Sequence, residues 1–117
     1  MTNLNLAAGL FGLAAIGGIA MLVIRLRGAP RPPTWLALGH GLLAVSGLIA
    51  LIAAWNGGSH SPIVGWSLAV LCLAAAGGAT IFIGFHLPGK PLPIPLIFAH
   101  GLLAATGWGL LLFALFG

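Results

Sequence analysis

The sequence of 117 residues contains no aspartate and no glutamate. Its whole charge inventory is four cations, 3% of the chain, where an average soluble domain carries about a quarter charged residues. Without acids there is no catalytic carboxylate pair, no Ser-His-Asp triad and no carboxylate cage for Ca²⁺ or Mg²⁺. Without a charged surface the chain would not stay dissolved, so a soluble globular protein is excluded.

Cysteine is almost absent as well. The single Cys72 leaves no disulfide possible within the chain. The pI of about 11.7 reflects the missing acids and not a basic patch, because only four cations are present. We therefore expect no nucleic-acid partner.

The chain is rich in long runs of hydrophobic residues. Hydrophobic residues make up 61% of the sequence, and the mean hydropathy is +1.21. Charges and Pro/Gly clusters cut it into four apolar runs, residues 6–24, 35–55, 63–85 and 96–116. Each is about 20 residues long, enough for an α-helix to cross a bilayer core. The sequence predicts an all-α membrane protein, with residues 1–117 forming one four-helix transmembrane domain in the lipid bilayer.

The connections between the runs are short, which predicts antiparallel hairpins in an up-down bundle. All four cations lie in the first connection, residues 25–33, or the third, residues 87–93. The positive-inside rule places these two loops in the cytoplasm and both termini outside, in the inner (cytoplasmic) membrane of a cell.

The chain also repeats itself. A shift of 60 positions aligns residues 1–57 with residues 61–117 without a gap, and the segment HGLLAVSG at 40–47 recurs as HGLLAATG at 100–107. We interpret this as a tandem duplication of a two-helix hairpin. Two copies with the same orientation are related by a pseudo-two-fold axis along the membrane normal, which places the second and fourth helices on a diagonal.

His40 and His100 are the ionisable groups that lie well inside the spans, each about 10 Å from the cytoplasmic boundary. An ionisable residue inside a membrane is a functional hypothesis by default. Both lie on the matched helix face, so the two imidazoles should face each other and ligate one metal, such as the iron of haem b. Two other interpretations stay open: a structural pair held by hydrogen bonds, or another ligand such as a quinone, a bacteriochlorophyll pigment or copper.

A porphyrin is a broad plate and needs helix surfaces with small side chains beside it. The helices that carry the histidines offer six small residues near them: Gly41, Ala44, Gly47, Gly101, Ala104 and Gly107. The two propionates of a haem would need partners at that end of the spans, which are the cations Arg25, Arg27, Arg31 and Lys90, with His86 as a further candidate. We interpret His86, at the end of the third span, as an interfacial residue. Trp108 faces either lipid or the cofactor.

A small four-helix membrane protein with His40-Gly41 and His100-Gly101 resembles the b-type cytochromes of the cytochrome b561 class. That class usually holds two haems on four intramembrane histidines, and this chain offers two. The resemblance therefore implies one haem, and electron exchange with quinol.

Our leading hypothesis is a single-haem electron carrier that works with quinone or with other subunits of a membrane complex. The alternatives are a cofactor-free accessory subunit of such a complex and, less favoured because no acid is present to couple ions, a small transporter.

Overall fold

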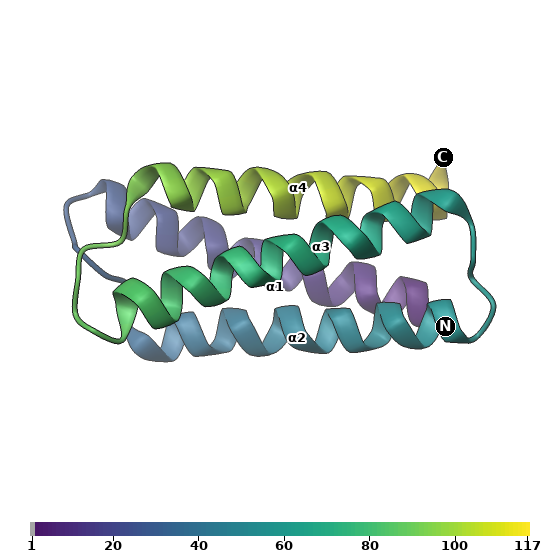
Figure 1. Ribbon diagram of the computed structural model, residues 1–117, viewed down its shortest axis with the longest axis horizontal. Coiled ribbons are helices and arrows are strands. Elements are labelled where there is room, and N and C mark those ends of the chain that lie inside the picture. Colours follow the sequence, from purple (N-terminus) through teal and green to yellow (C-terminus); the bar gives the residue numbers. More distant parts are fainter. Residues whose placement is uncertain (1) are drawn as a thin grey trace.

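The computed structural model describes residues 2–117 as four long helices joined by short loops (Figure 1). The helices are α1 (Asn3–Leu26), α2 (Thr34–Asn56), α3 (Pro62–Ile81) and α4 (Ile94–Phe116), and a π-helical segment, η1 (Phe82–His86), continues α3. All four spans are long and apolar enough to cross a membrane. The prediction of an all-α, four-span membrane protein is confirmed.

The helix ends follow local capping chemistry. The side chains of Thr2 and Ser61 accept hydrogen bonds from the backbone N–H groups of the first turns of α1 and α3, at 3.2 and 3.3 Å. Beyond the ends of α1, α2 and η1, the chain turns away at Gly28, Gly58 and Gly89, whose φ angles are 109°, 110° and 81°. Residues with a side chain rarely adopt this backbone conformation, so glycine is needed at these turns.

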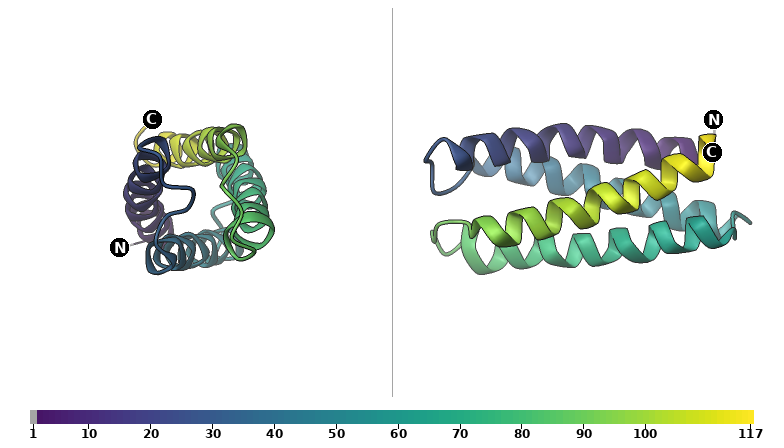
Figure 2. Two further views of the ribbon diagram at one scale, coloured as in Figure 1. Left: turned by 90° about the vertical axis from the view of Figure 1, so that its left-hand side faces the viewer. Right: turned by 90° about the horizontal axis from the view of Figure 1, so that it is seen from above.

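The helices stand at the corners of a square, in chain order around it, when the bundle is viewed from its end (Figure 2). Packing is closest within the hairpins α1–α2 and α3–α4 and looser where the hairpins meet, between α1 and α4 and between α2 and α3. The bundle measures 43 × 22 × 20 Å. Both loops that carry the cations lie at the same end, which we call the cap (Figure 1).

The two halves of the bundle differ in packing. The core cluster lies in the half away from the cap, near the start of α1 and α3 and the end of α2 and α4, and includes Phe11, Leu51, Leu71 and Leu111. Large apolar side chains such as Ile16, Leu42 and Leu102 point outward and are more than 60% exposed, which suits contact with lipid. The half next to the cap is hollow, and it holds the candidate site.

The sequence-derived spans place the helix ends to within a few residues. α1 begins three residues before the predicted start, because Thr2 caps a polar first turn that hydropathy alone does not assign to a span. The face of α2 that matches α4 consists of Leu36, His40, Ala44, Gly47, Leu51 and Ala54. None of these six residues is exposed, which confirms that this face points into the bundle. On α4, Leu96 differs: it lies in the first turn and is 41% exposed.

Candidate functional site

A cavity of about 690 Å³ occupies the half of the bundle next to the cap, and all four helices line it. Its walls are built from pairs of residues that lie 60 positions apart in the sequence. The small members of these pairs are Ala14 and Ala74, Gly18 and Gly78, Gly41 and Gly101, and Ala44 and Ala104. The cavity thus has nearly the same wall from each hairpin.

His40 and His100 both line this cavity. Each is the seventh residue of its helix, α2 or α4, so the two rings enter at matching depths from diagonal corners. Their ring centroids are 6.1 Å apart, and the ring planes are nearly perpendicular, at 82°. The structure brings the two imidazoles together inside the bundle.

Each imidazole is held by a backbone carbonyl of the neighbouring helix in its own hairpin. The Nδ1 atom of His40 lies 2.7 Å from the carbonyl oxygen of Ala14, and that of His100 lies 2.7 Å from the carbonyl oxygen of Ala74. A carbonyl only accepts, so Nδ1 carries the hydrogen in both rings. In a neutral ring this leaves a lone pair on Nε2, which makes no hydrogen bond with residues 2–117.

The sequence predicted Gly18 and Gly78 as small residues for close helix packing and for the surface beside a cofactor, and not as contacts of the histidine rings. A Cβ atom at Gly18 would lie 3.2 Å from Cε1 of His40, and one at Gly78 would lie 3.0 Å from Cε1 of His100. The bare glycine backbone therefore lets each ring lie against the neighbouring helix. A signal was present in the sequence, because Gly18 and Gly78 lie 60 positions apart, at the same place in the two repeats.

The predicted small residues divide into two groups. Gly41, Ala44, Gly101 and Ala104 line the cavity. Gly47 and Gly107 belong to the packed half instead: a Cβ at Gly47 would lie 3.0 Å from the ring of Phe11, and one at Gly107 would lie 2.5 Å from Cγ of Leu71. These two glycines allow close packing of the helices within each hairpin.

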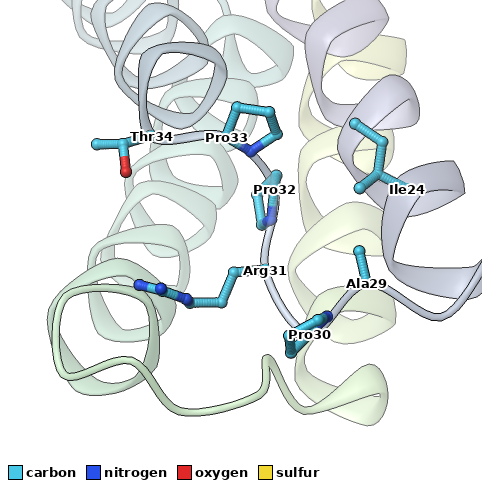
Figure 3. Close-up of a pocket in the computed structure, with 7 residues that line it drawn as sticks. All are labelled: Ile24, Ala29, Pro30, Arg31, Pro32, Pro33 and Thr34. Carbon is cyan, nitrogen blue, oxygen red and sulfur yellow. The ribbon is translucent and has the colours of Figure 1, made fainter.

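The four cations lie at the cap, and none of them lines the cavity. Arg25 donates from Nε to the carbonyl oxygen of Leu92, at 2.9 Å, and Arg31 donates from Nη1 to the carbonyl oxygen of His86, at 2.8 Å. Figure 3 shows Arg31 reaching from the first loop toward the end of the third span, beside a hollow of about 510 Å³. Arg27 and Lys90 are exposed.

These contacts tie the two cap loops together. The backbone N–H of Leu92 also donates to the carbonyl oxygen of Pro30, at 3.0 Å. The buried side chains of Pro32 and Leu92 line the cavity at this end, below the cations. The cap is therefore apolar toward the cavity and positively charged on its outer side.

Two further side chains face the cavity. Trp108 lines it and donates from Nε1 to the carbonyl oxygen of Ala8, at 2.9 Å, so this side chain points into the bundle. His86 also lines it and is only 2% exposed. His86 ends the third span, where the sequence predicted an interfacial residue, but its ring is buried within the protein at the end of η1.

The donor set limits which metals fit. Within residues 2–117, no group of three or more His, Cys, Asp or Glu side chains is placed to hold a metal ion. Two imidazoles alone leave most metal ions short of ligands. Two imidazoles with free Nε2 atoms do suit a metal whose other positions are already filled by a planar macrocycle.

The cavity also has room for a flat group. It extends between α1 and α4, beside Ala15 and Ala105, and between α2 and α3, beside Val45 and Ala75. These are the two looser helix contacts. The space therefore forms a slot between the two hairpins, with one histidine on each side.

No protein-family model, curated protein or solved structure matches the chain. The functional argument therefore depends on the geometry of the site.

Proposed function

We propose that this protein is a membrane-embedded electron carrier that holds one b-type haem between His40 and His100. One observation carries the proposal: each hairpin presents an imidazole whose Nδ1 is bound to a backbone carbonyl at 2.7 Å, and the centroids of the two rings lie 6.1 Å apart. Two imidazoles on opposite sides of one metal, with metal–nitrogen bonds of about 2.0 Å, place their ring centroids roughly 6 Å apart. The observed separation supports this ligand pair.

The residues of this chain would have distinct roles toward the haem. His40 and His100 would hold the metal through Nε2, and the carbonyl groups of Ala14 and Ala74 keep both rings oriented and their Nε2 atoms unprotonated. The small side chains of the slot leave space for the macrocycle: Gly41, Ala44, Gly101 and Ala104. When bound, the haem supplies reversible one-electron transfer.

The surroundings fit a membrane carrier. The outer faces of the helices are apolar, and the cations gather at one end. We place the cap in the cytoplasm of a cell with an inner membrane, with both termini outside, because positively charged loops stay on the cytoplasmic side. Quinol within the bilayer or another subunit of a membrane complex would exchange electrons with the haem.

The test is a spectrum of the protein purified from cells supplied with haem. We expect the reduced-minus-oxidised difference spectrum of a b-type cytochrome with two histidine ligands. Either His40→Ala or His100→Ala should abolish it, because each removes one axial nitrogen. His60→Ala is the matched control: this exposed ring lies in the loop after α2, against Trp55, and its loss should leave the spectrum unchanged.

A colourless wild-type protein that also takes up no added haem would overturn the proposal. If His40→Ala then lowered only the resistance to unfolding, the histidines would be a structural pair, and the cofactor-free accessory subunit would become the better hypothesis.

A further inference from the structure

One buried polar atom is left without a partner in residues 2–117, and it is Nδ1 of His86. The ring is 2% exposed and lines the same cavity as His40 and His100. A buried nitrogen without a hydrogen bond is unfavourable, because it has lost its bonds to water and gained none in the protein, so such an atom calls for an explanation. One explanation is that this nitrogen forms its hydrogen bond with a ligand.

The rest of the His86 residue is firmly held. Its Nε2 lies 3.0 Å from the hydroxyl of Thr34, its carbonyl oxygen accepts from Arg31, and its ring stacks on Phe82 with centroids 5.0 Å apart. The π turn that sets this position exists in one hairpin only, since the equivalent residues 22–26 are α-helical and end in Leu26. π turns inside helices occur frequently at functional sites.

The charges around the ring indicate what kind of atom it would bind. The chain has no acid, so an anion in the cavity must come from a ligand. Arg31 is bonded to the carbonyl of His86 itself, and the cap carries three further cations. When the Thr34 hydroxyl donates to Nε2, Nδ1 carries the hydrogen and is ready to donate to a ligand oxygen.

The height of the ring matches the polar edge of a haem. Thr34, which contacts His86, precedes His40 by six residues on α2, so His86 lies about 9 Å nearer the cap than the imidazole pair. The carboxylate arms of a tetrapyrrole extend from one edge of its ring, and the cap is the charged end of this cavity. His86 is the ionisable side chain that lines the cavity between the pair and the cap.

We propose that Nδ1 of His86 donates a hydrogen bond to a carboxylate of the tetrapyrrole held between His40 and His100. This inference rests on the proposed function and makes it more specific. It gives the carboxylate a partner inside the cavity, where none of the four cations reaches. Arg31 then acts indirectly, by holding the end of η1 and adding positive charge near the ring.

The experiment compares haem with haem whose two carboxylates are converted to methyl esters, titrated into the ligand-free protein in detergent. The wild type should bind haem about tenfold to a hundredfold more tightly than the ester, the effect of one hydrogen bond to a charged group. His86→Gln keeps a group for Thr34 but loses Nδ1, and it should bind the two compounds about equally. The double variant R27Q/K90Q, which removes the exposed cations, should keep the preference.

Wild-type protein that binds haem through both histidines but does not prefer it over the ester would overturn this inference and leave the proposed function standing. A preference that survives in His86→Gln, or a variant that weakens both compounds equally, would also overturn it. A wild type that binds neither compound defeats the proposed function itself.

A second measurement needs no variant and covers the case in which His86→Gln fails to fold. In wild-type protein labelled with ¹⁵N-histidine and loaded with reduced, diamagnetic haem, the Nδ1 proton of His86 should give a strongly downfield resonance. That resonance should be absent with the ester. Its presence with both compounds, or with neither, contradicts the inference.

Discussion

The α1–α2 and α3–α4 hairpins make the same contacts around the cavity. In both, the histidine Nδ1 meets a carbonyl 26 residues earlier at 2.7 Å, and a glycine four residues after that carbonyl lies against the ring. In both, a large side chain of the first helix, Phe11 or Leu71, covers a glycine of the second. These shared contacts define the framework that holds the imidazole pair.

The hairpins differ away from that pair. Leu48 in α2 corresponds to Trp108 in α4, which reaches across to α1 and bonds to the carbonyl of Ala8. Ala7 corresponds to Ser67, whose hydroxyl is fully buried and donates to the carbonyl oxygen of Gly107, at 2.7 Å. The third difference is His86 in place of Leu26.

The pattern of these differences is informative. Where both hairpins must do the same thing, at the imidazoles, the two hydrogen bonds have the same length of 2.7 Å. Where only one contact is needed, as in joining α4 to α1 or placing a polar group near the cap, one hairpin carries it. The substitutions below at Trp108, Ser67 and Ala7 make one hairpin more like the other, and those at the glycines test contacts that the two hairpins share.

The largest loss of stability should follow Trp108→Leu, which gives α4 the residue of α2. It removes the hydrogen bond to the carbonyl of Ala8 and leaves space beside Gly12, because the indole lies so close that a Cβ at Gly12 would be 3.3 Å from it. We expect a loss of about 2–3 kcal/mol, below the 3–5 kcal/mol typical of replacing a buried Trp by Ala. Unfolding in detergent followed by circular dichroism measures it.

Trp66→Leu is the control for that substitution, because Trp66 is 67% exposed on the outer face of α3. Its effect should be small. Equal losses from the two substitutions would mean that the contact between α4 and α1 does not depend on Trp108.

A smaller and unequal effect should distinguish the two packing glycines. Gly107→Ala places a Cβ against the branch carbon and the backbone nitrogen of Leu71, at 2.5 and 3.3 Å, whereas Gly47→Ala meets only the outer ring atoms of Phe11. A ring tip can move aside and a backbone cannot. We expect Gly107→Ala to cost about 2 kcal/mol and Gly47→Ala clearly less.

The same unfolding measurement on Gly41→Ala and Gly101→Ala provides the baseline, since no atom lies within 4 Å of a Cβ at either position. These two should change stability little. If Gly47→Ala proved as harmless as Gly41→Ala, the packing role given to Gly47 would be wrong.

The fold was predictable because two strong signals act on the whole chain. Runs of about 20 apolar residues have no stable alternative to a helix in lipid. The identity of residues 40–43 with 100–103 places two histidines at equal depth, and it does so without knowledge of any contact. The sequence also predicts that both charged loops lie at one end, because all four cations fall in the first and third connections between spans.

The detailed contacts of the site could not be predicted from the sequence, for physical reasons. Every residue has a carbonyl, so nothing in the sequence singles out Ala14 or Ala74 as a partner. Gly47 shares a face with His40 but lies two turns deeper, where the packed half of the bundle begins. The burial of His86 depends on a π turn that has no recognisable residue signature.

The smallest effect should come from Ser67→Ala, which gives α3 the residue found at Ala7. The lost bond joins the Ser67 hydroxyl to a carbonyl inside α4, and such bonds between membrane helices contribute about 0.6 kcal/mol on average. Ala7→Ser is the matched opposite change, because it offers α1 a hydroxyl at the position equivalent to Ser67. We expect Ser67→Ala to lower the midpoint of unfolding slightly and Ala7→Ser to raise or preserve it. A larger loss for Ser67→Ala than for Gly107→Ala would mean that polar bonding, and not close packing at the glycines, holds the second hairpin together.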